Sequence, residues 1–339
     1  MKKTLIYLLI AFAGLPVLVS AQSMHFSQYY NAPLLMNPAN TALLPEHDYR
    51  IGSNYRSQWA SVPVPYSTFS LYSDMQLIKS EEKFNCFGLG AAIFTDRAGD
   101  GQLGLTRGDL SFAYHLQAGD NSIISLGASG GYVQRSINYD KLSYDFQWNG
   151  ETFNVNNPSG EPNRGIIKTN YATVAAGLSY SYFSDVIFLK FSGGAANVNQ
   201  PKETFYSTGT NEVGLRPTAD IDLVAKLSSN VIINPSVYYA NQKDAFELIY
   251  GSLFRFNIEP GKSSPTQLIL GGYHRLGDAV VGVMGLAWRD LQFMANYDHT
   301  LSKLAPYNNA KGALEFSLIY MGVYPSSSVN RKTLGCPRF

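Results

Sequence analysis

Charged residues are scarce in this sequence: they make up 15% of its 339 residues, against about 25% in an average soluble protein. The net charge is only +1, so the chain lacks the strongly basic surface that is typical of nucleic-acid-binding proteins. Beyond the N-terminus no run approaches the ~18 consecutive apolar residues of a membrane-spanning helix, which excludes a helical membrane protein. Disorder is also excluded, because hydrophobic residues make up 45% of the chain.

Cysteine is nearly absent as well, with Cys86 and Cys336 as the two examples. Two cysteines exclude a disulfide scaffold and a multi-cysteine metal site. The two could pair in an oxidising compartment, but Cys86 has Phe84 and Gly88 nearby, a setting more typical of a residue that fills a small packing space. The sequence leaves this pairing open.

The N-terminus has the pattern of a secretory signal peptide. Two lysines follow the first methionine, residues 5–19 are apolar, and Ser20 and Ala21 supply the small residues of a cleavage site. We expect residues 1–21 to be removed and the mature chain to work outside the cytoplasm. A retained anchor helix is the alternative, and lipoprotein anchoring is not indicated because no cysteine follows the cleavage site.

From residue 50 onward the chain alternates with a period of two, the pattern of β-strands with one apolar and one polar face. Ile51 and Tyr55 share one face of the first segment, while Arg50, Asn54 and Arg56 share the other. Segments of this kind recur along the chain, and each is near the ~9–11 residues that cross a bilayer as a tilted strand. The expected strands are about 50–59, 66–75, 84–95, 105–116, 122–134, 168–181, 186–195, 215–227, 231–241, 245–256, 266–274, 279–288, 291–299 and 313–322.

The connections between these segments are short on one side and often long on the other, with the longest at 135–167 and 196–214. Outer-membrane barrels have an even strand number, short periplasmic turns and long extracellular loops. We therefore predict an all-β fold, a transmembrane antiparallel β-barrel of about 14 strands in the outer membrane, over residues 50–322. A soluble periplasmic β-sandwich or propeller would explain the alternation but not the low charge combined with the loop asymmetry.

Two segments fall outside the predicted barrel. Residues 22–49 contain Pro33 and Pro38 among several asparagines, which interrupts any regular element, so we expect a periplasmic or lumenal N-terminal segment. Residues 323–339 follow the last strand and are expected to form a C-terminal periplasmic tail.

Several motifs resemble one known family. They are Phe-Ser-Gln-Tyr-Tyr-Asn-Ala-Pro-Leu at 26–34 followed by Asn-Pro-Ala at 37–39, Tyr-Arg-Ser-Gln-Trp at 55–59, Val-Pro-Val-Pro-Tyr-Ser-Thr at 62–68 and Asp-Arg-Ala-Gly at 96–99. Together they are similar to the start of the PorP/SprF family of type IX secretion membrane proteins. The rest of the chain matches in architecture, in length and in the terminal Cys-Pro-Arg-Phe.

The resemblance implies an integral outer-membrane barrel of the Bacteroidota that assists type IX secretion. Such proteins are commonly paired with a large exported adhesin, such as those used in gliding motility. They are thought to engage either the C-terminal signal domain of the secreted protein or the periplasmic part of the secretion machinery. The expected partners are thus a secreted substrate, secretion components and outer-membrane lipid, with no nucleic acid.

An enzymatic function is not expected. The five histidines are His25, His47, His115, His274 and His299. Asp298 precedes His299 directly, but strand neighbours point to opposite faces, and no Gly-x-Ser-x-Gly motif is present. The loop at 96–101 lacks the ligand spacing of a calcium-binding EF-hand and is typical of an ordinary turn. We predict no catalytic residue, no cofactor and no metal.

The polar strand faces supply the candidate partner-binding residues, because the lumen is the polar side of such a barrel. These candidates are Arg50, Asn54, Arg56, Gln58, Trp59, Arg107, Asp109 and His115. One interpretation is that they contact an inserted partner chain. The other, which we favour because polar residues line every such lumen, is an internal network that holds the lumen and the N-terminal segment in place.

The leading hypothesis is therefore a noncatalytic barrel that binds, helps to export or anchors a type IX secretion substrate. The rival is an outer-membrane porin or a channel for hydrophobic solutes, which would have the same strand pattern.

Overall fold

The computed structural model describes residues 26–59, 64–79, 84–154, 156–160, 165–205, 209–259, 266–303 and 305–325. The predicted signal peptide, most of the predicted C-terminal tail and Cys336 lie outside the described residues, so the pairing of Cys336 with Cys86 stays open. Within the described ranges, no helix has the length and apolar character needed to cross a membrane.

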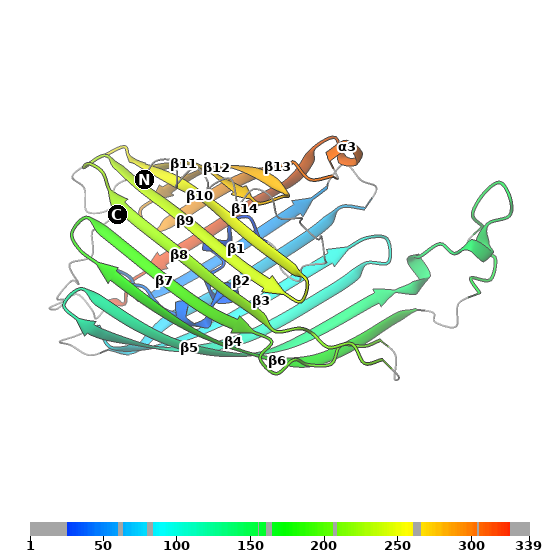
Figure 1. Ribbon diagram of the computed structural model, residues 1–339, viewed down its shortest axis with the longest axis horizontal. Coiled ribbons are helices and arrows are strands. Elements are labelled where there is room, and N and C mark those ends of the chain that lie inside the picture. The colour runs from blue at the N-terminus through cyan, green and yellow to red at the C-terminus, as the bar shows by residue number, and fades with distance from the viewer. Residues whose placement is uncertain are drawn as a thin grey trace, which may run out of the picture.

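Fourteen antiparallel strands form a closed barrel (Figure 1), as predicted. Each strand pairs with its neighbours in the chain, and the pairing of the first with the last closes the sheet. The strands are β1 (Tyr49–Gln58), β2 (Tyr66–Lys79), β3 (Cys86–Ala98), β4 (Leu103–Gly119), β5 (Ser122–Asn138), β6 (Ile166–Phe183), β7 (Ile187–Ala196), β8 (Arg216–Lys226), β9 (Val231–Gln242), β10 (Ala245–Asn257), β11 (Gln267–Arg275), β12 (Ala279–Trp288), β13 (Leu291–Thr300) and β14 (Lys311–Gly322).

The two faces of the barrel wall are reversed relative to a soluble protein. On β4, the outward Leu110 and Phe112 are 57% and 59% exposed, whereas the inward Asp109, Ser111 and His115 are buried. An apolar outer band and a polar interior are what a strand needs when lipid lies on one side. The alternation read from the sequence therefore gives the correct faces.

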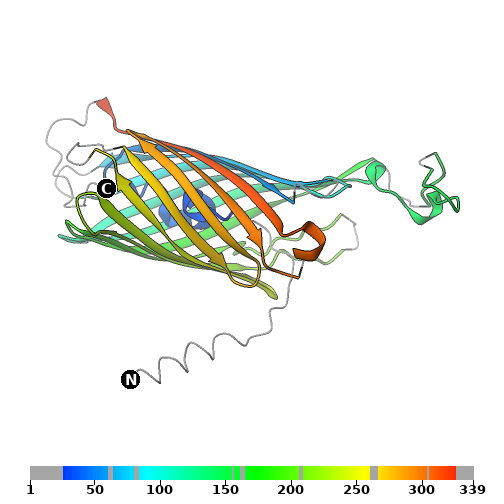
Figure 2. The same cartoon turned by 90° about the horizontal axis from the view of Figure 1, so that it is seen from above.

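The two ends of the barrel differ in their connections. One end has short turns, such as residues 289–290 between β12 and β13, and β1 begins and β14 ends there. The other end has the long loops, including α3 (Ala305–Asn308) and an arm between β5 and β6 that contains η4 (Tyr139–Lys141) and η5 (Asp145–Gln147). Figures 1 and 2 show this arm projecting well beyond the wall. By the loop-length rule, the arm end is the extracellular one.

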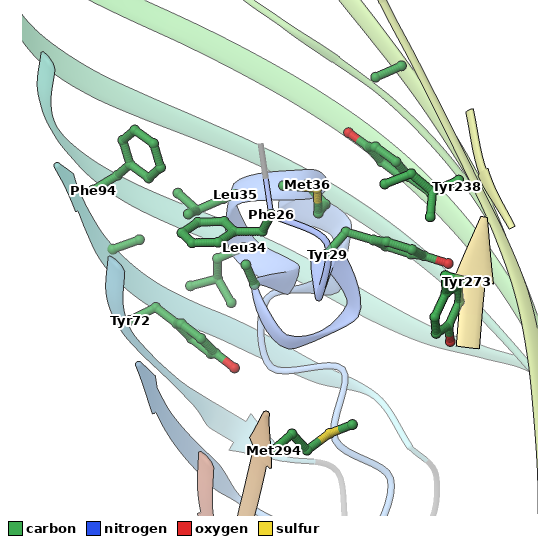
Figure 3. Packing of buried hydrophobic residues seen from close by; sticks show 14 of the residues in the cluster. Phe26, Tyr29, Leu34, Leu35, Met36, Tyr72, Phe94, Tyr238, Tyr273 and Met294 are labelled. Atoms are coloured by element: carbon green, nitrogen blue, oxygen red, sulfur yellow. The ribbon is translucent and has the colours of Figure 1, made fainter. Parts of the chain in front are cut away.

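Residues 26–48, here called the plug segment, lie inside the barrel (Figure 2). They form three short helical turns, η2 (Tyr29–Asn31), α2 (Pro33–Met36) and η3 (Pro38–Asn40). Most of their side chains are buried. The main hydrophobic cluster of the protein therefore lies within the lumen, between the plug segment and the inner wall (Figure 3).

Candidate functional site

The extracellular half of the lumen holds the start of the plug segment through a cluster of buried charges. Glu315 accepts the backbone N–H groups of Ser27 and Gln28, at 3.0 and 2.9 Å. Arg56 bridges Glu315 and Asp298, with 3.0 Å from its guanidinium nitrogens to each carboxylate. The Ser27 hydroxyl donates to Asp298 at 2.7 Å and accepts from Arg56 at 2.8 Å.

A second arginine completes this cluster from β11. Arg275 donates to Asp298 at 3.0 Å and to the Ser27 hydroxyl at 2.8 Å. The side chains of Arg56, Asp298 and Glu315 are each at most 1% exposed. Buried charges are tolerated only when they are paired and hydrogen-bonded. The plug segment therefore supplies donors and an acceptor that this part of the wall needs.

Aromatic stacking holds the next turn of the plug segment against β9 and β11. The ring of Tyr29 stacks on Tyr238 at 4.9 Å, and the ring of Tyr30 stacks on Tyr273 at 5.4 Å. The Tyr29 hydroxyl donates to Ser236 at 2.8 Å. Figure 3 shows Tyr29 pointing towards Tyr238 and Tyr273, while Phe26 and Leu35 lie on the side of Phe94.

Glycines in the wall let the middle of the plug segment lie directly on the strands. A Cβ atom on Gly177 would overlap the Asn37 side chain, and one on Gly127 would overlap the backbone at Pro38. Asn37 accepts from the N–H of Ala39 at 2.8 Å, which caps η3, and donates to a wall carbonyl on β7 at 3.0 Å. Larger side chains at these wall positions would push the segment off the strands.

The periplasmic half of the lumen binds the end of the plug segment. Asp74 pairs with Arg50, at 2.7 Å between Oδ2 and Nη2, and accepts the N–H of Ala42 at 2.6 Å. His115 lies 2.8 Å from the carbonyl oxygen of Thr41 through Nε2. Because a carbonyl can only accept, Nε2 carries the proton in this contact.

The predicted partner-binding residues thus fall into three groups. Four of them hold the plug segment: Arg56 and His115 through the contacts above, Arg50 by donating to the carbonyl of Asn40 at 3.4 Å, and Asn54 by donating to the carbonyl of Asn31 at 3.0 Å. All four therefore contact the protein's own N-terminal segment inside the lumen.

The remaining candidates lie elsewhere. Arg107 and Asp109 pair with each other on β4, at 2.7 Å. Gln58 ends β1, and its side chain is half-buried. Trp59 follows at the extracellular end, where its N–H donates to Gly312 at 2.8 Å and its ring lies 5.0 Å from that of Tyr66. Neither group touches the plug segment through these contacts.

Comparison with known proteins identifies the family of the chain. The profile of the family described as type IX secretion system membrane protein PorP/SprF matches residues 18–320. The chain belongs to the PorP/SprF family. The match includes the whole plug segment and the strands from β1 into β14. The plug segment and the barrel therefore together form the unit that this PorP/SprF protein shares with its family. None of the curated proteins compared matches the sequence.

Solved structures share the barrel fold of this PorP/SprF protein. The toluene transporter TbuX of Ralstonia pickettii superposes with a TM-score of 0.50 at 8% identity, over 87% of this chain and 94% of its own. The TodX deltaS2S3 mutant, a monoaromatic hydrocarbon channel, gives a TM-score of 0.51 at 8% identity, with the same coverage of 87% and 94%. At this identity the likeness concerns the fold alone.

Sequence reasoning missed the wall residues that complete the network. They are Asp74, Gln76, Arg275, Asp298 and Glu315. A signal was available, because Glu315 is a charge at an inward position between the outward Leu314 and Phe316. In a membrane barrel such an inward charge needs buried partners, and here they are Arg56 of the wall and the backbone N–H groups of Ser27 and Gln28 in the plug segment.

Asp298 and His299, the neighbours considered as a catalytic pair, do not face one another. Asp298 is buried and His299 is exposed, so the two point to opposite faces of β13, as expected. Asp96, in the loop weighed as a calcium site, accepts from Thr68 at 2.6 Å. The described parts of the chain contain no group of three His, Cys, Asp or Glu side chains that could hold a metal ion. Cys86 is buried.

Proposed function

We propose that this PorP/SprF protein is a noncatalytic outer-membrane barrel that binds, helps to export or anchors a secreted surface protein. The observation that carries the proposal is the occupied lumen. Arg50, Asn54, Arg56 and His115 already contact the protein's own plug segment, and buried ion pairs hold that segment in place. A barrel filled in this way is better suited to hold a partner on its outer surfaces than to conduct one through its centre.

The extracellular arm is the surface that we assign to the secreted partner. Phe146 is 77% exposed there, and Trp148 and Phe153 are about half exposed with their rings 5.1 Å apart. Clustered exposed aromatic residues are typical of protein-binding surfaces. The arm lies outside the barrel wall (Figure 2), so these aromatics are not part of the lipid-facing band.

The resemblance to the family gives two routes for recruitment, and both remain part of the proposal. The partner would be captured through its C-terminal signal domain, or the barrel would contact the periplasmic secretion machinery. A large adhesin of the kind used in gliding motility is the expected type of client. Residues 1–21 would direct export and be cleaved before the barrel reaches the outer membrane.

A transport channel is the second candidate function. The observation in its favour is the fold shared with TbuX and TodX, which are described as a toluene transporter and a hydrocarbon channel. Single-channel recording of the purified barrel in a planar bilayer separates the two functions. Steady, solute-selective conductance would favour the channel, and a non-conducting barrel would favour the anchor.

The direct test is mass spectrometry of the proteins that copurify with the tagged barrel from outer membranes in mild detergent. We expect a large surface protein in near-equal amount. A variant with Phe146, Trp148 and Phe153 changed to serine should lose this protein, while Tyr307→Ser should keep it. Tyr307 is a matched control because it is 85% exposed on α3, at the same end of the barrel but outside the arm. Recovery of the barrel alone from the unaltered protein would contradict the proposal.

A further inference from the structure

The outward face of β3, β4, β5 and β6 changes character near the extracellular end. One row across these strands is Ile93, Gly108, Tyr132 and Ala172. The next outward row is entirely polar: Thr95, Thr106, Gln134 and Asn170. An exposed tyrosine followed by polar side chains is typical of the boundary between the apolar band and the headgroup layer.

One row further out, this face carries two cations separated by small residues. The row is Arg97, Gly104, Ser136 and Lys168, one residue from each strand. Arg97 and Lys168 are exposed. Three strand spacings of about 4.8 Å separate their Cα atoms by roughly 14 Å. Because both side chains are long, their positive charges can approach each other more closely than this.

A hollow of about 220 Å³ lies beside Arg97 on this face, and Ser136, the neighbour of Lys168 in the row, also lines it. Its lining residues are Thr95, Asp96, Arg97, Gln102, Gly104, Thr106, Ser136, Asn138 and Ile166. The hollow exists because Gly104 has no side chain and the side chain of Ser136 is small, whereas Arg97 and Lys168 in the same row have long side chains. The lining is rich in hydroxyl, amide and guanidinium donors, which bind the oxygens of phosphate and sugar groups.

The charges around the hollow favour an anion. Within the described ranges, the side chains of Arg97 and Lys168 make neither a hydrogen bond nor an ion pair. Asp96 is the acidic residue of the lining, and Thr68 donates to its carboxylate from the neighbouring strand. Asp96 also points to the lumen side of β3, because it alternates with the outward Thr95 and Arg97.

We propose that this hollow binds a phosphate group on the headgroup of an outer-leaflet lipid, with Arg97 and Lys168 as its cations. The position of the hollow along the barrel axis favours a lipid over a soluble anion, because the hollow begins where the apolar outer band ends. The bound headgroup would fix the depth of the barrel and the orientation of the arm, which continues from β5 and β6. This inference is independent of whether the barrel is an anchor or a channel.

The test is native mass spectrometry of the delipidated full-length protein titrated with diphosphoryl lipid A and, separately, with dephosphorylated lipid A. Removing one cation near an anionic lipid surface weakens binding by about fivefold, so Arg97→Gln and Lys168→Gln should each weaken binding of diphosphoryl lipid A by that factor. Lys202→Gln, an exposed cation of a neighbouring extracellular loop, should leave binding unchanged. Ser136→Phe fills the hollow without removing a charge and should also weaken binding.

Three results would overturn the proposal. Dephosphorylated lipid A could bind as tightly as the phosphorylated form, or the Arg97→Gln, Lys168→Gln double variant could bind like the unaltered protein. Millimolar inorganic phosphate could displace lipid A completely, which would identify a site for free phosphate instead. The heat-dependent gel mobility of each variant shows whether the barrel is folded before its binding is compared.

Discussion

Replacing Arg56 with methionine should test the idea that buried charges hold the plug segment. Arg56 is 1% exposed and donates to Ser27, Asp298 and Glu315 at 2.8 to 3.0 Å. Methionine keeps much of the volume but leaves Glu315 buried without the arginine that contacts it. Breaking a buried ion pair by removing one partner costs about 3–5 kcal/mol, and we expect a decrease of this size in the free energy of unfolding.

A double variant makes this prediction sharper. Arg56→Met with Glu315→Leu removes both charges, so its loss should be smaller than the sum of the two single losses by about 0.5–3 kcal/mol. Some loss remains, because Glu315 also accepts two backbone N–H groups of the plug segment. Urea unfolding in lipid vesicles, followed by fluorescence of the three tryptophans, measures all four proteins. A loss under about 1 kcal/mol for Arg56→Met, or strict additivity in the double variant, would refute the reasoning.

Other substitutions test the wall. Gly177→Leu should displace the plug segment, because even a Cβ atom there overlaps Asn37; limited proteolysis should then cut the segment faster, and an unchanged cleavage rate would contradict the close contact. His115→Leu removes the donor to the Thr41 carbonyl and should cost about 1–3 kcal/mol in urea unfolding, part of which His115→Gln should restore. Phe112→Lys, on the outward face, should cost about 2–4 kcal/mol in lipid vesicles; full stability would mean that this face does not meet lipid.

The strands could be predicted because lipid imposes a simple rule on every second residue. The segment expected at 279–288 is β12 with the same bounds. The prediction for β4 and β5 stops short, because both strands extend further at the extracellular end and β4 also continues to Gly119 at the periplasmic end. Beyond the predicted extracellular bounds the outward positions carry small or polar residues, as at Gly104 and Ser136, so the alternation fades although backbone pairing continues.

The contents of the lumen could be predicted only in outline. The parity of Arg50, Asn54 and Arg56 identifies an inward polar face, but it does not say which residues meet that face. The answer depends on contacts between distant parts of the chain, such as Arg56 with Asp298. The sequence also does not reveal which wall positions require glycine. Gly177 is required because Asn37 lies against it, and this contact exists only in the folded barrel.

The plug segment also connects the first and last strands of the wall from within. β1 pairs with β14, and the segment directly before β1 donates hydrogen bonds to Glu315 on β14. Gln28 and Glu315 are separated by 287 positions in sequence, so the carboxylate that receives the plug segment is among the last wall groups to be synthesised. The plug segment contacts Arg56 on β1 and Glu315 on β14, so it fastens the seam between the first and last strands as well as filling the lumen.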